Sequence, residues 1–338
     1  MRLVALVESP EHVCCRYRIN AFRPWLERSG HELELQPWPK RWWSRLQMSE
    51  VLGDADVVIL QRKLLPLWDL YLLRCAAHRL VFDFDDAVFL RDSFSPRGLH
   101  SARRLHRFMA TLETMDAVVA GNRFLASEAS RWIPPGRLMV VPTCVDAESY
   151  PRAAHQAAGP AARLVWVGSS STLQGLEAAR DILDHVGQGL PGLRLNLVCD
   201  RPLTLGHLAV DFRPWAEATE AADIAAADIG VAWVPDDLWS RGKCGLKVLQ
   251  YMAAGLPVVA NPVGVHTEMV RHGVTGFLAR TPGEWLDCVG ELARNPGLRK
   301  RMGTAARNLA EKEYGTGLGA HRWLALLNRF RKAARQVA

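Results

Sequence analysis

Long apolar runs are missing from this 338-residue sequence. No apolar stretch approaches the roughly 20 residues that a membrane-spanning helix needs, and the mean hydropathy is close to zero. The first residues, MRLVALVESP, hold one arginine and a very short apolar run that ends at an acid. We therefore expect a first β-strand there rather than a signal peptide.

Metal-binding cysteine spacing is missing as well. Of the seven cysteines, only Cys14 and Cys15 are adjacent. An odd number of cysteines without metal spacing predicts reduced thiols in a cytoplasmic protein. We expect the cysteines to be small core residues.

Motifs of several protein classes are absent. The sequence has no zinc-finger spacing, no helix-turn-helix pattern and no aromatic ribonucleoprotein motif, so we expect no nucleic-acid partner. It also lacks Gly-x-Ser-x-Gly, His-Glu-x-x-His, a Walker loop, and Gly-x-Gly-x-x-Gly after any strand. The formal net charge of +7 then indicates a solvated basic face, an anionic small substrate or an anionic membrane surface.

Short β-branched runs alternate with helical stretches throughout the chain. The expected strands are residues 2–8, 32–38, 56–62, 79–85, 117–122 and 138–144, then 163–169, 193–200, 210–215, 228–235, 256–262 and 276–279. This alternation predicts the α/β class, with two Rossmann-like, doubly wound domains facing each other across a cleft. Ligands of such sheets bind beyond the carboxyl ends of the strands.

Composition predicts the domain limits. The segment PRAAHQAAGPAA, residues 151–162, is rich in small residues and lacks apolar periodicity, so it is the expected linker. We predict an N-terminal domain over residues 1–152 and a second domain over residues 160–315. Residues 316–338 form a predicted amphipathic helix.

One segment, KCGLKVLQYMAAGLPVVANPVG at residues 243–264, places cations near the start of an expected helix. In a helix from residue 243, Lys243, Lys247 and Gln250 would share one narrow arc. Cations there oppose the helix dipole, whereas a bound anion would reverse the sign of that effect. The segment therefore predicts a diphosphate site, with surface lysines on an ordinary helix as the alternative.

A glycine turn follows the next expected strand, in NPVGVHTEMV. We expect Gly264 to leave the N–H groups of Val265 and His266 free for phosphate. Glu268 would accept hydrogen bonds from a sugar, or would only stabilise the first turn of the following helix.

A third segment, WVGSSSTLQG, follows the first strand of the second half. Its Gly168, Ser169 and Ser170 are predicted to hold phosphate or sugar, and a helix cap with Thr172 at the cap position is the alternative. The turn that begins at Trp215, after residues 212–215, is predicted to bind the base of a nucleotide.

Acidic residues end the fourth expected strand, in FDFDDAVF. Three close carboxylates need a cation, a shared proton or an electropositive ligand. A metal site and simple loop acids are both alternatives here, and we predict no metal, because acidic metal motifs of this kind are typical of a single-domain sugar-transferase architecture.

These motifs, in this order, resemble the retaining nucleotide-sugar glycosyltransferases of the GT-B fold, family 4. LKVLQYMAAGLPVVANPVGVHTEMVRHGVTGFLA is similar to the donor-binding signature of that family. VPTCVDAESY and VGSSSTLQGLEAA are similar to two further family segments. The combination of Asp-x-Asp-Asp, Gly-Ser-x-Ser-Thr and Lys-x-x-Gln-Tyr-Met resembles one subgroup.

The resemblance implies a metal-independent hexosyltransferase that needs no cofactor. It implies a UDP- or GDP-sugar donor in the second domain and a hydroxyl acceptor, a glycan or a lipid-linked molecule, in the first. It also implies that the C-terminal helix crosses back to the first domain. In this interpretation Lys247, Lys243 and Arg241 stabilise the leaving diphosphate.

Further roles follow from the same resemblance. Gln250 would bind the ribose and Glu268 the donor sugar, while Asp85 or Asp86 would orient the acceptor or act as the base. The basic segment PWPKRWWSRL and an arginine-rich helix at residues 101–115 suit an anionic lipid at the inner face of the membrane.

Several positions depart from the family pattern. Two glutamates of many relatives are replaced by Gly242 and Gln250, and a phosphate-binding Arg and Lys fall on Ser169 or Ser170 and on Gln174. A family His-Asp pair falls on Asp85 and Asp86. A non-catalytic GT-B scaffold and a GT-B sugar-nucleotide epimerase are therefore the alternatives.

Overall fold

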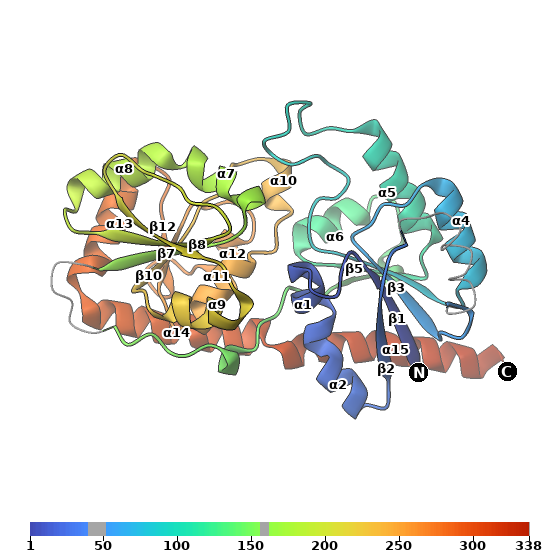
Figure 1. Cartoon of the computed structure of the whole chain (residues 1–338). Coiled ribbons are helices and arrows are strands. Elements are labelled where there is room, and N and C mark those ends of the chain that lie inside the picture. The colour runs from blue at the N-terminus through green and yellow to red at the C-terminus, as the bar shows by residue number, and fades with distance from the viewer. Residues whose placement is uncertain (40–51, 156–161, 338) are drawn as a thin grey trace. The chain divides into compact units, whose positions relative to one another are not determined.

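The computed structural model describes residues 1–39, 52–155 and 162–337. The chain forms two compact units (Figure 1). The first unit comprises Met1–Cys144, Arg241–Cys244 and Thr316–Ala338, and the second comprises Val145–Ser240 and Gly245–Gly315. The domain limits expected at residues 152 and 160 lie further along the chain than this division. Most of the basic segment at residues 37–46 and the centre of the expected linker lie outside the described residues.

The first unit contains a parallel sheet with the strand order β2-β1-β3-β4-β5-β6. Its strands are β1 (Arg2–Val7), β2 (Glu32–Pro37), β3 (Val57–Gln61), β4 (Leu80–Phe84), β5 (Ala117–Ala120) and β6 (Leu138–Val140). The strands β1, β3, β4 and β5 are buried along nearly their whole length. Such continuous apolar strands are typical of parallel sheets that are covered on both faces.

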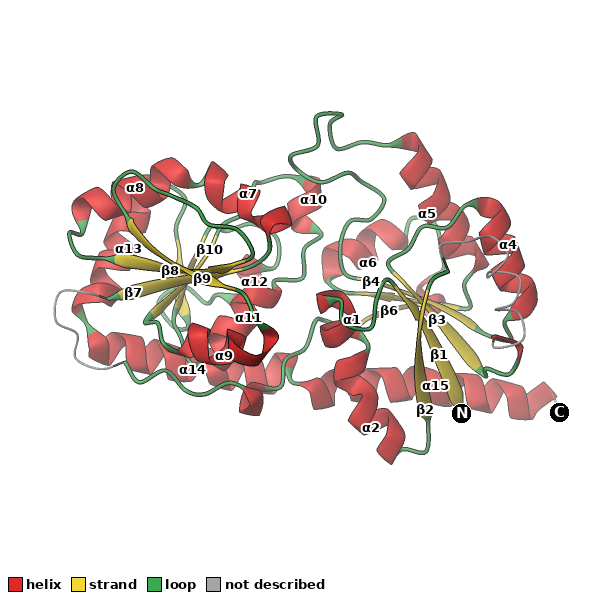
Figure 2. Cartoon of the chain, in the orientation of Figure 1, coloured by secondary structure: helices red, strands yellow, loops and turns green. Residues whose placement is uncertain are grey.

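Helices cover this sheet, as Figure 2 shows. They are α1 (Val13–Arg18), α2 (Arg23–Arg28), α4 (Leu67–Ala76), α5 (Ala102–Thr114), α6 (Arg123–Ala129) and α15 (Thr316–Val337). The last helix contributes Trp323, Leu326 and Leu327 to the same apolar cluster as Phe22 of the amino-terminal segment. The predicted amphipathic stripe of residues 316–338 therefore packs into the core of the first unit.

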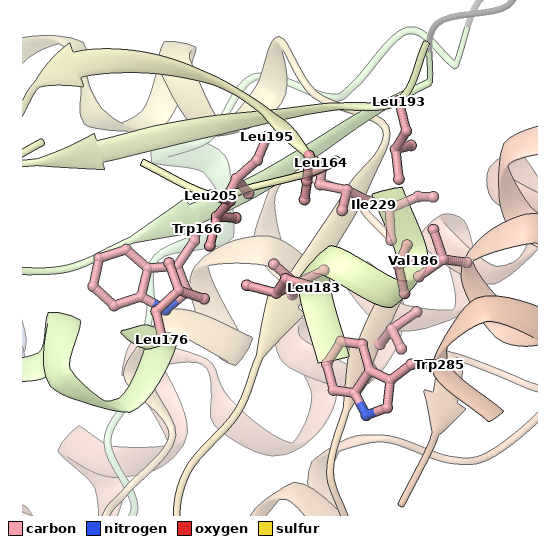
Figure 3. Packing of buried hydrophobic residues seen from close by; sticks show 14 of the residues in the cluster. Leu164, Trp166, Leu176, Leu183, Val186, Leu193, Leu195, Leu205, Ile229 and Trp285 are labelled. Atoms are coloured by element: carbon pink, nitrogen blue, oxygen red, sulfur yellow. The ribbon is translucent and has the colours of Figure 1, made fainter. Parts of the chain in front are cut away.

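The second unit contains another parallel sheet, with the order β12-β11-β10-β7-β8-β9. Its strands are β7 (Arg163–Val167), β8 (Arg194–Cys199), β9 (Ala209–Pro214), β10 (Ile229–Ala232), β11 (Val258–Ala260) and β12 (Gly276–Leu278). Its helices are α7 (Ser170–Ala178), α8 (Arg180–Gly189), α9 (Glu217–Ala225), α10 (Leu238–Arg241), α11 (Leu246–Ala253), α12 (His266–Met269), α13 (Pro282–Arg294) and α14 (Pro296–Tyr314). Figure 3 shows one face of its core, where Trp166, Leu183 and Trp285 pack together.

Each strand expected from the sequence has a counterpart in these sheets, so the predicted α/β class is confirmed. In both sheets the order of connection reverses beside the first strand. The reversal lies between β1 and β3 in the first unit and between β7 and β10 in the second. The carboxyl ends of the strands at such a reversal form the crevice where open α/β sheets bind ligands.

Arg307 of α14 fixes the start of the second unit to its helices. Its guanidinium donates to the carbonyl oxygens of Ala147 at 2.7 Å, Tyr150 at 3.0 Å and Ala253 at 2.6 Å. All three hydrogen bonds are buried, so water cannot replace the donor.

We expect Arg307→Met to lower the free energy of unfolding by about 3 kcal/mol, because it leaves three buried carbonyl oxygens without a donor. Urea-induced unfolding followed by circular dichroism measures this. Glu311→Gln, which removes only the exposed partner of Arg307, should change stability by less than about 1 kcal/mol. Equal losses in the two variants would contradict the assignment.

Candidate functional site

Gly245 determines where α11 begins. It precedes the helix with a left-handed backbone, φ 67°, and a Cβ atom added there would lie 2.6 Å from the sulfur of Met269. Lys247 is thereby placed in the first turn of α11, and its predicted position near the start of a helix is confirmed. Lys243 precedes the helix and belongs to the first unit, so the prediction that it shares a helical arc with Lys247 is wrong.

Lys247 lies over a buried aromatic ring at the switch point of the second sheet. Its Nζ is 4.1 Å from the centroid of the Trp166 ring, which belongs to β7. A desolvated cation–π contact of this kind holds an ammonium group in place. The side chain is half-buried, and it lies near the carboxyl end of β7.

The predicted glycine turn follows β11, and Gly264 adopts a left-handed φ of 54°. The N–H of His266 donates to the carbonyl oxygen of Val263 at 3.2 Å, so the prediction that it is free is wrong. Closure of the turn requires that bond. In the turn of residues 262–267, all of which the structure describes, the N–H groups of Gly264 and Val265 donate to no protein group. Glu268 is exposed in the short helix α12 that follows.

The side chain of His266 has a structural role. It is 4 % exposed, and its Nδ1 lies 3.0 Å from the carbonyl oxygen of Asn261. Burial, and secondarily the nearby charge of Lys247, lowers the pKa of His266 to about 4. The imidazole of His266 is therefore neutral near pH 7 and adds no positive charge to that of Lys247.

The serine segment after β7 forms a helix cap. Ser169 is the N-cap of α7, and its N–H donates to Oγ1 of Thr172 at 3.2 Å. The cap interpretation is thus confirmed, with Ser169 rather than Thr172 at the cap position. Ser170 donates through its N–H and its hydroxyl to Asp200, at 2.5 and 2.8 Å. A Cβ atom on Gly168 would lie 2.5 Å from the ring of Trp166, so only glycine fits there.

Gln250 and Trp215 are both engaged by neighbouring side chains. Gln250 is 3 % exposed and donates through Nε2 to the hydroxyl oxygen of Tyr150 at 3.2 Å. Trp215 donates through Nε1 to Glu220 at 2.8 Å, while its ring stays exposed after the end of β9. Gln174, one of the departures from the family pattern, is exposed on α7. The roles predicted for Gln250 in ribose binding and for Trp215 in base binding stay predictions.

The acids at the end of β4 are neutralised by cations of the protein itself. Asp83 and Arg18 form a fully buried pair, with Arg18 Nε 3.3 Å from the carboxylate. Burial raises the pKa of Asp83 to about 6, against the opposing effect of Arg18. This pair is structural, because neither side chain is exposed.

Asp85 and Asp86 share a second cation, Arg62. Its Nε lies 3.3 Å from Asp85, and its Nη2 donates to Asp86 at 2.6 Å. The ammonium group of Lys243 lies 3.7 Å from Asp86. These side chains retain some exposure at the carboxyl end of the sheet, where Arg62 follows β3 with an unusual φ of 57°. They form a partly open cluster of alternating charge.

Sequence reasoning missed Arg62 and Asn122. Arg62 lies at the carboxyl end of a predicted strand. Ligands of open α/β sheets bind at these strand ends, so Arg62 was as much a candidate as the acids. Asn122 points its amide nitrogen at the carbonyl oxygens of Gly242 and Lys243, at 3.1 and 3.0 Å. This explains why Arg241–Cys244 belongs to the first unit. Arg241 itself is exposed.

Two properties of the described residues bear on alternatives raised above. In that part of the chain, no group of three or more His, Cys, Asp or Glu side chains is placed to hold a metal ion. None of the described helices combines the length and apolar character that crossing a membrane requires.

The second unit matches a known family over nearly its whole length. Residues 147–295 match the family described as Glycosyl transferases group 1. These residues form a Glycosyl transferases group 1 domain. A D-inositol 3-phosphate glycosyltransferase of Kribbella flavida is 44% identical over 64 residues, which are 18% of this chain and 15% of that protein. A second one, from Streptomyces scabiei, is 42% identical over 69 residues, 20% of this chain and 16% of its own length.

Solved structures resemble the chain over almost all its length. A sucrose-phosphate synthase from Thermosynechococcus elongatus has a TM-score of 0.74 at 14% identity and covers 98% of this chain and 100% of its own. The Anabaena protein HepE, in complex with UDP and glucose, has a TM-score of 0.66 at 17% identity, with 97% and 100% covered. The predicted GT-B fold is confirmed by these likenesses. The predicted enzyme class, glycosyltransferase, agrees with the group 1 domain.

His266 makes stability depend on pH. The unfolded histidine takes a proton near pH 6.5 and the folded one only near pH 4, so the unfolded state binds more protons between these values. The free energy of unfolding should therefore fall by up to about 3 kcal/mol as pH drops through this window. His266→Asn, which keeps a neutral donor to Asn261, should weaken this dependence in urea titrations. The exposed His185→Asn should retain it, and identical slopes in all three proteins would contradict the assignment.

Proposed function

We propose that this chain transfers a sugar from a nucleoside diphosphate sugar to a hydroxyl acceptor, with retention of the anomeric configuration and without a metal ion. The observation that carries the proposal is the position of Lys247. It lies in the first turn of α11, inside the group 1 domain and at the switch point of the second sheet. UDP in the HepE complexes makes UDP-sugars the first donors to test.

The leaving diphosphate is the group that such a site has to stabilise. Charge develops on its oxygens as the bond to the sugar breaks, and preorganised cations and N–H groups lower the barrier most effectively in a partly dry site. Lys247 offers the charge, held in place over Trp166. Gly264 and Val265 offer N–H groups on the turn after β11, and Glu268 is the candidate partner of the donor sugar.

The acceptor belongs, in this proposal, to the first unit. Asp85 and Asp86 lie at the carboxyl end of β4, held by Arg62 and Lys243. A carboxylate held in this way is oriented before the acceptor arrives, so it can accept the proton of an attacking hydroxyl group. The acceptor is a glycan or a lipid-linked hydroxyl compound, used at the inner face of a membrane to which the protein binds peripherally.

Lys247→Met tests the donor site, because methionine keeps an aliphatic chain over Trp166 and removes the charge. Turnover at saturating UDP-sugar should fall by about a hundredfold or more, and the thermal shift caused by UDP should shrink. Lys312→Met, an exposed lysine on α14, is the matched control. Near-normal turnover of Lys247→Met would show that this lysine does not stabilise the diphosphate.

Asp86→Asn tests the acceptor role while preserving side-chain shape. We expect kcat to drop by about a hundredfold with little change in the dissociation constant for UDP measured by calorimetry. Asp92→Asn, in an exposed loop of the same unit, should be neutral. If the variant binds UDP much more weakly but turns over normally, the role of Asp86 is to position Lys243 for the diphosphate and not to accept a proton. The anomeric signal of the product in NMR, with and without EDTA, tests retention and metal independence.

A further inference from the structure

Asn261 follows β11 directly, and its buried side chain binds the loop that follows the neighbouring strand, β10. Its Oδ1 accepts a hydrogen bond from the N–H of Val234 at 3.1 Å, and its Nδ2 donates to the carbonyl oxygen of the same residue at 2.6 Å. The planar amide of asparagine carries a donor beside an acceptor, so it can satisfy both backbone groups of one residue. Because Asn261 is only 7 % exposed, water cannot readily replace these bonds.

Val234 is a fixed attachment point for this side chain. The preceding residue, Trp233, packs against the apolar core of the second unit. A Cβ atom added to Gly175 of α7 would lie 3.4 Å from the carbonyl oxygen of Trp233, so α7 also lies against this loop. The core and α7 therefore hold the loop to which Asn261 is bound.

The backbone of Asn261 holds both ends of the glycine turn that comes next. Its carbonyl oxygen accepts a hydrogen bond from the N–H of Val263 at 2.9 Å, and Nδ1 of His266 lies 3.0 Å from the same oxygen. Between these two residues are Gly264 and Val265, whose N–H groups donate to no protein group in this fully described turn. One residue thus fixes the turn on both sides of the two N–H groups.

The turn lies next to the start of α11. A Cβ atom added to Gly245 would lie 2.9 Å from Cγ2 of Val265, and Lys247 is in the first turn of the helix that follows Gly245. N–H groups and a cation that are oriented in advance stabilise an anion better than mobile groups do, because binding then costs less conformational entropy. Whatever fixes this turn therefore affects how tightly the site can bind a diphosphate.

We propose that Asn261 is the positioning residue of the diphosphate site. Its side chain fixes the turn at residues 262–266 to the loop after β10, so the N–H groups of Gly264 and Val265 are oriented before the nucleotide arrives. In this role Asn261 contacts no substrate and acts through the turn alone. The inference rests on the proposed function, because its ligand is the diphosphate of the sugar donor.

NMR titration of the full chain with uridine and with UDP tests the proposal, and guanosine and GDP form the second pair. The ratio of the dissociation constants of nucleoside and diphosphate measures what the phosphates contribute to binding. Asn261→Ala should reduce this ratio by about tenfold, because the turn loses its fixed orientation, while the affinity for the nucleoside stays nearly unchanged. A residue with a purely structural role would lower both affinities together or neither.

Two further variants separate orientation from folding. Asn261→Ser is the milder change should Asn261→Ala fail to fold, and the ratio should fall in it as well, because one short hydroxyl group cannot bind both backbone groups of Val234. Asn196→Ala is the matched control. Asn196 is fully buried in β8 of the same unit, and its side-chain amide forms no hydrogen bond with any described residue, so its removal should leave the ratio unchanged. Circular dichroism melting checks that each variant is folded at the temperature of the titration.

Two results would overturn the proposal. If Asn261→Ala and Asn261→Ser keep the full ratio, Asn261 does not position the turn, while the proposed transfer reaction stands. If the unaltered protein itself binds neither diphosphate better than its nucleoside, the turn holds no diphosphate, and the proposed function fails together with the role of Asn261.

Discussion

At Gly245 the backbone is left-handed, and the side chains of Met269 and Val265 occupy the space that a Cβ atom would need. Most of the candidate site depends on this position. It ends the stretch Arg241–Cys244, which packs in the first unit, and it begins α11 in the second. A helix that began earlier would carry Lys243 on its own face and away from Asp86. The left-handed backbone of Gly245 therefore keeps Lys243 out of the helix that carries Lys247.

Charge balance in the first unit follows a consistent pattern. Each acid at the end of β4 meets an arginine or lysine: Asp83 meets Arg18 in the dry interior, and Asp86 meets Arg62 near the surface. The buried pair is costly to break, because either ion alone would remain desolvated. The outer group is more accessible to water, so its cations and carboxylates can exchange partners when a polar ligand arrives. The same sheet edge thus combines a fixed pair with an adaptable one.

The sequence predicted the fold well because its strands are continuous apolar runs and its last helix has a clear apolar stripe. It also predicted that Lys247 lies near the start of a helix. It could not predict that Lys243 pairs with Asp86, or that Arg62 serves two acids, because those contacts join residues far apart in the chain. The sequence could not show that the N–H of His266 is hydrogen-bonded. That bond closes a turn in which Gly264 has a left-handed backbone, and residue types alone do not specify this backbone.

Helix α15 has a consequence for the order in which the chain folds as it is made. The core of the first unit includes Trp323, Leu326 and Leu327, which leave the ribosome after the whole of the second unit. Domains usually fold in the order of synthesis. Here the core of the first unit cannot be completed before α15 has been synthesised. The second unit can finish first. Until α15 has been synthesised, the apolar face that it covers beside β1 stays exposed.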